Sequence, residues 1–326
     1  MRRLRAGGSH EICHLVYAQI NFGMAQSKLL PLSEAVAQFV SDGDQVALGT
    51  AQETLIPFAA GHEIIRQRKK ELTLIGPISD ILFDQMIGAG CVSRIRAAWV
   101  GNVITGSGYN FRRAVENGRL QVEDHSNLTI SQALRAGAMG VPFLPARTAL
   151  GSSLYQANDG LREMNCPFTG EKLTAVAAIN PDVAIIHVQR ADEFGNAHCW
   201  GNLGVSREAC LAARHILITA EEIVPTEVIS SDPNRVITPG FKVSAVAHAP
   251  WGAHPSPVPG HYNRDHEFFL DYARQSKTAA AFAQWQAQWV DALKTSDDYL
   301  ALLGAARVAE LKIKRRAPTA VADFGY

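Results

Sequence analysis

The chain has 326 residues, of which 47% are hydrophobic and 19% are charged, a composition typical of globular proteins that bury a sizeable core. Lys plus Arg and Asp plus Glu are balanced at 31 each, so the overall charge gives no reason to expect a nucleic acid or an anionic membrane as partner. No apolar run approaches the ~20 residues that a helix needs to span a bilayer. A small molecule or another protein is the expected partner.

The first residues are basic, but they lack the pattern of a signal peptide, because Glu11 and His14 interrupt the apolar stretch that such a peptide requires. Met24 and the sequence AQSKLLPLSEAV behind it resemble a more natural start. We therefore expect residues 1–24 to be a disordered or non-native extension. Residues 25–326 contain no Gly/Ser-rich linker and no repeat, and we expect them to form a single α/β domain.

Helix and strand signals alternate from Leu32 onward. Ser33 can cap a helix, and Gly140 stands just past the end of another, in the position that glycine favours. Helices are expected over residues 33–41, 55–70, 80–90, 108–118 and 129–140. Strands are expected over residues 45–49, 71–77, 94–102, 119–124, 182–189 and 215–220.

The last two of these strands are apolar and β-branched throughout, as strands buried on both faces are. Strands that alternate with helices favour an open, mainly parallel sheet covered by helices on both faces. Residues 279–313 are rich in Ala, Gln and Leu and predict a helical C-terminus. The expected fold class is α/β.

The five cysteines are odd in number, scattered, and never spaced as CxxC. They are Cys13, Cys91, Cys166, Cys199 and Cys210. This usage indicates a reduced, cytoplasmic protein without a structural zinc site.

Several motifs begin like functional sites but are incomplete. His62-Glu63 opens a zinc-protease HExxH pattern, yet Arg66 stands where the second histidine ligand belongs. Residues 106–111 lack the third glycine of a dinucleotide-binding GxGxxG. His254, His261 and His266 are close in sequence, but their spacing matches no regular metal site. We expect no metal.

One short stretch, PWGAHPSPVPGHYNRD at Pro250–Asp265, holds four prolines and two glycines. Each proline fixes φ and lowers the entropy of the unfolded chain, which suits a rigid excursion better than a flexible linker. Trp251 and Tyr262 can anchor it. We expect this proline loop to pack against its own domain or against a partner subunit.

Three long segments carry a family resemblance. They are LTISQALRAGAMGVPFLPARTALGSSL from Leu128, INPDVAIIHVQRADEFGNAHCWG from Ile179, and ITAEEIVPTEVISSDPNRVITPGFKVSAVAHAPWGAHP from Ile218. In this order they resemble the α (A) subunit of family I CoA-transferases, most closely the glutaconate CoA-transferase type. The resemblance runs from about Leu32 to Tyr272.

The resemblance implies a β subunit of similar architecture, in an αβ heterodimer or an α2β2 heterotetramer. The family exchanges CoA between an acyl-CoA and a free carboxylate by a ping-pong mechanism through a glutamyl-CoA thioester. A coenzyme A thioester is thus a substrate, and no bound cofactor is expected. In the family the nucleophilic glutamate lies in the β subunit, within a Ser-Glu-Asn-Gly-like turn. The resemblance therefore implies no catalytic nucleophile in this chain.

Glu116-Asn117-Gly118 looks like part of that turn, but it lacks the preceding serine. It ends the expected helix over residues 108–118, and Gly118 is most simply the residue that terminates this helix. We interpret the match as structural.

Glycine-rich strand ends allow a substrate to approach the backbone, and ligands of open α/β sheets gather at the carboxyl ends of strands. The candidate substrate, CoA or oxyanion positions are accordingly Gly49, Thr50, Gly101, Asn102, Ser126, Asn127, Gly151, Ser152 and Ser153. Arg147 is a further candidate, because a guanidinium can bind a carboxylate with two hydrogen bonds. For each position, a turn residue or a surface ion pair is the alternative.

Two other functions stay open. One branch of the family hydrolyses a ring-bearing acyl-CoA with a glutamate of the α subunit, which aligns near Ser126-Asn127. Neither residue is a carboxylate, although Glu123 and Asp124 are close. The third function is a non-catalytic ligand-binding domain, which related folds provide.

Overall fold

The computed structural model describes residues 26–313, so the extension expected over residues 1–24 lies outside the described part. A central sheet has the strand order β13-β12-β10-β1-β2-β3-β6, and β11 is added at the end of β10. All neighbours along this path are parallel, and only β11 is antiparallel to its neighbour. Its strands are β1 (Gln45–Ala47), β2 (Leu72–Ile78), β3 (Val92–Trp99), β6 (Gln121–Asp124), β10 (Val183–Ala191), β11 (Ala197–His198), β12 (His215–Ile223) and β13 (Ala245–His248).

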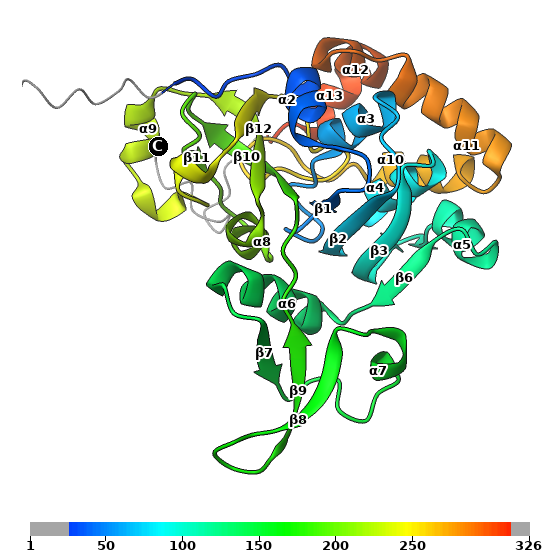
Figure 1. Ribbon diagram of the computed structural model, residues 1–326. Coiled ribbons are helices and arrows are strands. Elements are labelled where there is room, and N and C mark those ends of the chain that lie inside the picture. Colours follow the sequence, from blue (N-terminus) through cyan, green and yellow to red (C-terminus); the bar gives the residue numbers. More distant parts are fainter. Residues whose placement is uncertain (1–25, 314–326) are drawn as a thin grey trace, which may run out of the picture.

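Helices cover both faces of this sheet (Figure 1). The first face carries α2 (Leu32–Phe39), α3 (Phe58–Arg66), α4 (Asp80–Gly88) and α5 (Tyr109–Glu116). The second face carries α6 (Asn127–Met139) and α8 (Ser206–Ala212), which contact each other. Short helical segments α9 (Thr226–Ser230), η1 (Pro233–Arg235) and η2 (Gly240–Lys242) precede β13. The predicted α/β class with helices on both faces is confirmed.

The C-terminal part of the described chain is helical, as predicted. It comprises α10 (His266–Gln275), α11 (Ala279–Gln286), the π-helical turn η3 (Ala287–Asp291), α12 (Ser296–Leu303) and α13 (Ala305–Leu311). These helices lie outside α3 and α4, which they contact through η3 and α11 (Figure 1). Phe269, Tyr272 and Trp285 are the large side chains that they bury in the core of the first face.

The two strands with the strongest sequence signals, β10 and β12, are also the most buried ones. Almost every side chain of β10 and of the first two thirds of β12 is buried. A strand with a helix layer on each side has no face left for water, which explains the absence of polar alternation. The predicted helix end at Gly140 is also confirmed: this residue has φ +68° and follows α6 directly.

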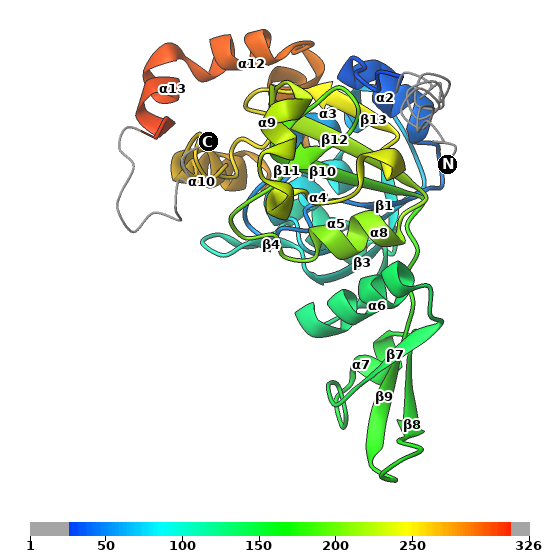
Figure 2. The same cartoon turned by 90° about the vertical axis from the view of Figure 1, so that its left-hand side faces the viewer.

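A second, smaller sheet was not expected from the sequence. Strands β7 (Phe143–Ala146), β9 (Lys172–Ala177) and β8 (Leu161–Asn165) pair antiparallel in that order, with α7 (Leu154–Ala157) beside them. This three-stranded unit extends away from the main sheet beyond α6 (Figure 2). Leu161 and Val176 bury its root against α6. A short hairpin, β4 (Gly101–Asn102) with β5 (Gly106–Ser107), also follows β3.

The proline loop packs against its own domain, one of the two predicted alternatives. Trp251 stacks on Tyr262 with 4.3 Å between the ring centroids. Tyr262 donates its hydroxyl proton to Glu221 at 2.6 Å, and the backbone N–H of Trp251 donates to the same carboxylate at 2.8 Å. His187 completes this buried group through a 2.8 Å contact with Glu221. The loop is thereby tied to the middle of β10 and β12.

Candidate functional site

The turn after β1 is packed so closely that it excludes a side chain. Gly49 has φ +68°, and a Cβ atom on it would lie 2.2 Å from the Oγ atom of Ser79. Thr50 is buried, and its hydroxyl lies 2.9 Å from that of Ser206 on α8. The two predicted positions thus form a rigid backbone turn at the carboxyl end of the central strand, with its shape fixed from both faces of the sheet.

A buried carboxylate joins the ends of the next two strands. Asp80 follows β2, is 1% exposed and has φ +49°. Asn102, in β4 just after β3, donates to its Oδ1 atom at 2.7 Å, and Arg264 of the proline loop donates to its Oδ2 atom at 2.6 Å. Burial raises the pKa of Asp80 to about 6, although Arg264 opposes that shift. We call Asp80, Asn102 and Arg264 the edge cluster.

The edge cluster holds the hairpin of β4 and β5. Gly101 has φ +149°, and a Cβ atom there would lie 2.4 Å from the carbonyl oxygen of Gly106. The side-chain oxygen of Asn102 accepts from the N–H of Ile104 at 2.8 Å. The tip of the hairpin presents Val103 and Ile104, which are 63% and 51% exposed. A predicted site residue therefore positions an apolar tip at the edge of the sheet.

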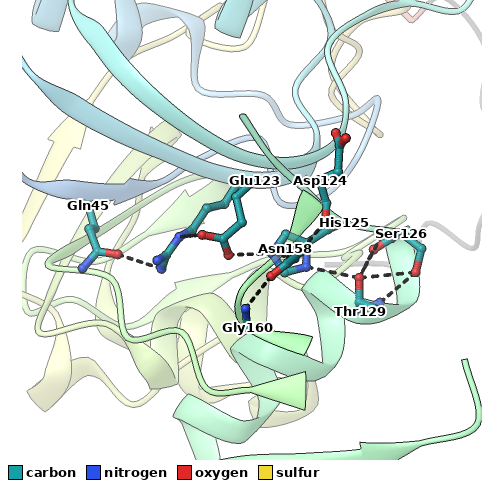
Figure 3. Close-up of polar contacts among 9 residues, drawn as sticks. Gln45, Glu123, Asp124, His125, Ser126, Thr129, Asn158 and Gly160 are labelled. Atoms are coloured by element: carbon teal, nitrogen blue, oxygen red, sulfur yellow. Dashed lines mark hydrogen bonds and ion pairs between the residues drawn. The ribbon is translucent and has the colours of Figure 1, made fainter. Parts of the chain in front are cut away.

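Ser126 caps α6 in a reciprocal capping box (Figure 3). Its hydroxyl oxygen accepts from the N–H of Thr129 at 3.1 Å, and its own N–H donates to the Thr129 hydroxyl at 2.8 Å. Asn127 is the first residue of the helix and is exposed. Both predicted residues therefore lie at a helix N-terminus at the carboxyl end of β6, where backbone N–H groups favour an anion.

A network of polar side chains contacts the start of α6 (Figure 3). Arg96 of β3 donates to Glu123 at 2.9 Å, and His125 lies 3.1 Å from the other oxygen of Glu123 and 3.1 Å from the Thr129 hydroxyl. Burial opposes ionisation, but the hydrogen bond from His125 and the charge of Arg96 outweigh it and lower the pKa of Glu123. Glu123 is therefore ionised, and its two oxygens are engaged by Arg96 and His125. The Asp124 carboxylate points away from the network (Figure 3).

The remaining predicted positions lie on the three-stranded unit. Arg147 forms a two-pronged ion pair with Glu171 at 2.7 and 2.8 Å, and its side chain is 77% exposed. Gly151, Ser152 and Ser153 form an exposed turn before α7. Asn158, just after α7, donates to the carbonyl of Asp124 at 2.8 Å and so brings this segment to the start of α6.

Gly49, Asn102 and Ser126 each follow the carboxyl end of a strand of the main sheet, namely β1, β3 and β6. Arg147 instead forms an ion pair with Glu171 on the three-stranded unit. Sequence reasoning missed Asp80 and Arg264. Asp80 stands three residues after the end of the strand predicted over residues 71–77, so the rule that selected the other strand ends could also have been applied to it. Arg264 is separated from Asp80 by 184 residues, and no local pattern marks it.

Glu116 is the last residue of α5, and Gly118 has φ +64°. This geometry agrees with the interpretation of Glu116-Asn117-Gly118 as a helix end.

Within residues 26–313, no group of three or more His, Cys, Asp or Glu side chains is placed to hold a metal ion. No helix of that part is long and apolar enough to cross a membrane.

The capping role of Ser126 makes a first prediction. Ser126→Ala removes an N-cap and is expected to cost about 1 kcal/mol in the free energy of unfolding. Ser131→Ala, in the same helix, is the matched control, because its hydroxyl only donates to the carbonyl of Asn127 on the exposed surface. Urea denaturation of both variants measures the difference, and equal losses would contradict the capping role. Any loss of turnover beyond the stability change would indicate that Ser126 also touches the substrate.

The sequence of the chain is similar to those of several known proteins. The family described as Coenzyme A transferase matches residues 30–249. The A subunit of the 3-oxoadipate CoA-transferase of Pseudomonas knackmussii is 41% identical over 84% of this chain and 98% of that protein. The A subunit of the glutaconate CoA-transferase of Acidaminococcus fermentans is 36% identical over 88% of this chain and 95% of that protein.

A crystal structure of glutaconate coenzyme A-transferase from Acidaminococcus fermentans superposes with a TM-score of 0.84, covering 88% of this chain and 96% of that one at 36% identity. One chain of a cholesterol ring-cleaving hydrolase of Rhodococcus jostii is 30% identical over 85% of this chain and 95% of that protein.

Proposed function

The chain belongs to the coenzyme A transferase family, and from this premise we propose that it acts as the α subunit of a two-subunit CoA-transferase that moves CoA between an acyl-CoA and a free carboxylic acid. The relatives at 41% and 36% identity are both named as the corresponding subunits of CoA-transferases. The observation that carries the proposal is the agreement of nearly the whole fold with glutaconate CoA-transferase.

The partner β subunit supplies the nucleophile in this proposal. Its glutamate attacks the acyl carbonyl, expels CoA thiolate and forms an acyl-glutamyl anhydride. The thiolate then attacks the glutamyl carbonyl, which releases the first acid and leaves a glutamyl-CoA thioester. The acceptor carboxylate attacks this thioester, expels CoA thiolate and forms a second acyl-glutamyl anhydride. The thiolate then attacks the acyl carbonyl of the acceptor, which gives the new acyl-CoA and regenerates the glutamate carboxylate. Every bond broken is matched by one formed, so the cycle needs no water, no redox partner and no resident cofactor.

The α subunit contributes binding and electrostatics at the carboxyl edge of the sheet. The backbone N–H groups of the rigid turn at Gly49 and Thr50 are candidates for the stabilisation of an oxyanion. The N–H groups of Asn127 and Leu128 at the start of α6 have no hydrogen-bond partner among the described residues, and such groups favour a carboxylate. The exposed hairpin tip at Val103 and Ile104 provides apolar surface next to the edge cluster. Each of these roles is part of the proposal.

The names of the two transferase relatives support a proposal for the substrate class. Glutaconate and 3-oxoadipate are both dicarboxylic acids, in which one carboxylate receives CoA and the other stays free. We propose a dicarboxylic acid as the acceptor here as well.

The four free cysteines of the described chain and their mostly buried positions are compatible with the proposed cytoplasmic location.

Hydrolysis of a ring-bearing acyl-CoA is the weaker alternative. The hydrolase relative is less similar than the two transferase relatives, at 30% identity. The position at which the family resemblance places a catalytic glutamate is occupied by the helix cap Ser126 and by Asn127. Glu123 is held by Arg96 and His125 and is not available as a base.

The test is a transfer assay with and without the partner β subunit. We expect no transfer from succinyl-CoA to glutaconate or 3-oxoadipate by this chain alone, and transfer with both chains present. Mass analysis is expected to find CoA bound as a thioester to a glutamate of the partner. Glu116→Gln in this chain is expected to leave the rate unchanged, because Glu116 only ends α5.

Transfer by this chain alone, or loss of transfer in the Glu116 variant, would contradict the assignment. Butyrate is the matched monocarboxylic acceptor, and equal rates for butyrate and glutaconate would contradict the proposed substrate class. Ring-opened products formed without any acceptor acid would establish the hydrolase instead.

A further inference from the structure

A cavity of about 380 Å³ lies on the first face of the sheet, between α3 and the C-terminal helices. Its walls come from the start of α2, from α3, from the proline loop and from the segment that joins η3 to α12. This volume lies within the ~300–1,000 Å³ typical of small-molecule sites. None of the strand-end positions of the candidate site contributes to the lining, so the cavity is separate from those positions.

The body of the cavity is aromatic. Phe58, Trp251, Trp289 and Tyr299 are its large side chains. Phe58 is 1% exposed, and Trp251 is 9% exposed and stacked on Tyr262, so both rings are held by packing. The rings of Trp289 and Tyr299 meet edge to face, with 5.8 Å between their centroids. A flat ligand of one or two rings fits such walls, because it gains both buried area and ring contacts.

His62, the first residue of the incomplete HExxH pattern, gives the cavity one open hydrogen-bond acceptor. Its Nε2 atom lies 2.9 Å from Oε1 of Gln85, an oxygen that only accepts, so Nε2 carries the ring proton. Burial lowers the pKa of His62 to about 4, which keeps the ring neutral and leaves Nδ1 as an acceptor.

The Nδ1 atom of His62 is accessible from the cavity. It has no hydrogen-bond partner among the described residues, yet it is not one of the partnerless polar atoms that are closed off from solvent. It therefore keeps accessible surface, which a ring that is only 4% exposed has on the side of the cavity that it lines. A buried acceptor of this kind favours a ligand that donates a proton to it.

The charged side chains of the lining are matched by other residues. Glu63 lies 2.7 Å from Arg66, and its second oxygen accepts from Gln67 at 2.7 Å. Lys294 is exposed, and it is attracted to the carboxylate of Asp298. A cavity without an unmatched buried charge favours a neutral ligand, because a charged one would lose its hydration without gaining a counterion.

The other two histidines of the lining do not offer the same acceptor. Nδ1 of His254 accepts from the Tyr299 hydroxyl at 2.7 Å, and its Nε2 atom donates to Asp265 at 3.0 Å. His248 is exposed, so water reaches its ring. Within the described part of the chain, His62 is thus the lining histidine that combines burial with an unpartnered nitrogen.

We propose that this cavity is a second ligand site, which binds a neutral aromatic molecule of one or two rings that carries a hydroxyl group. The hydroxyl donates its proton to Nδ1 of His62, and the rings lie against the aromatic walls. The site does not depend on the proposed transfer reaction, since every group that lines it belongs to this chain.

The test is equilibrium dialysis of the full chain at pH 7, alone and with its β subunit, using 2-naphthol as the probe. The control ligand is 2-methylnaphthalene, which has the same shape but a methyl group in place of the hydroxyl. We expect saturable one-to-one binding of 2-naphthol, roughly two- to tenfold tighter than that of the control, the net gain from one hydrogen bond. A purely apolar cavity would give the reverse order, because a methyl group leaves water more readily than a hydroxyl.

His62→Phe keeps a ring on α3 but removes the acceptor, and it is expected to bind 2-methylnaphthalene more tightly than 2-naphthol. His248→Phe is the matched control, since it replaces the exposed histidine of the lining, and it is expected to keep the order of the parent chain. Ala59→Leu adds volume to the lining and is expected to weaken binding of both ligands. Circular dichroism confirms that each variant is folded.

Tighter binding of 2-methylnaphthalene by the parent chain would overturn the proposal, and this comparison decides even if His62→Phe does not fold. A preference for 2-naphthol that is lost in His248→Phe but kept in His62→Phe would also overturn it. So would unchanged binding in Ala59→Leu, or no binding at millimolar 2-naphthol. Displacement of 2-naphthol by acetyl-CoA would assign the probe to the transferase site and would overturn the proposal as well.

Discussion

Gly49→Ala is expected to remove most of the transferase activity of the assembled enzyme and to lower its stability by roughly 3 kcal/mol. The added Cβ atom would lie 2.2 Å from Oγ, 2.6 Å from Cβ and 2.9 Å from Cα of Ser79, so the backbone at the end of β2 has to move. That backbone leads directly into Asp80. Urea denaturation of this chain and transfer rates with the β subunit measure the two effects.

Gly43→Ala is the matched control for this change. Gly43 also has a positive φ, +84°, but a Cβ atom there would meet nothing within 4 Å. It is expected to lose only about 1 kcal/mol, the conformational cost of a side chain in the left-handed region. Its transfer rate is expected to stay normal. Equal behaviour of the two variants would show that close packing at Gly49 has no functional part.

Arg264→Met is expected to destabilise the chain by about 3–5 kcal/mol at pH 7.5, because it leaves the buried Asp80 carboxylate without its cation. The two side chains are 12% and 1% exposed, so water cannot replace the lost partner. Asp80→Asn in the same chain is expected to restore part of the loss, since an amide needs no counterion. Chemical denaturation of the single and double variants provides the measurement.

The loss in Arg264→Met is also expected to depend on pH. Burial already raises the pKa of Asp80 to about 6 with Arg264 present, and removing the cation raises it further. A carboxyl with a raised pKa binds its proton more tightly in the folded chain, so its contribution to stability is present at low pH and is lost as the pH rises through that value. The variant should therefore be closest to the parent near pH 5 and furthest from it above pH 7.

Arg274→Met serves as the control for a surface pair. Arg274 pairs with Asp271, and these side chains are 62% and 55% exposed. Such pairs contribute about 0–1 kcal/mol, so little change is expected at any pH. A loss in Arg264→Met that does not change between pH 5 and 8 would contradict the role assigned to Asp80.

The main sheet could be predicted well because its signals are local. The apolar runs of β10 and β12 and the glycine after α6 depend on neighbours within a few residues. The confirmed helical C-terminus has the same origin in composition. The three-stranded unit was missed because its strands alternate only weakly: Leu161 is buried, while Arg162 and Glu163 are both exposed. Such a small sheet is stabilised by contact with α6, and a single sequence does not display that contact.

The candidate site was predictable only in part, for the same reason. Gly49, Asn102 and Ser126 follow strands and can be found by that rule alone. Arg264 acts at the edge cluster only after the proline loop has folded back across the sheet. The pairing of Arg264 with Asp80 is visible in the folded structure, but the positions of the two residues in the sequence do not indicate it. The predicted site roles of these strand-end residues, and of Arg147, stay predictions until the variants are measured.

The order of strands has a consequence for how the protein is made. β1 has only three residues, and its two neighbours are β2, which follows it closely, and β10, which begins at Val183. Until β10 has been translated, one side of β1 has no neighbouring strand. The first half of the sheet then exposes unpaired N–H and C=O groups to other chains. Closing so long a loop is slow, and chains released early are expected to aggregate. Chains truncated before residue 180 are therefore expected to be insoluble, whereas the full chain, in which β10 and the C-terminal helices are present, is not.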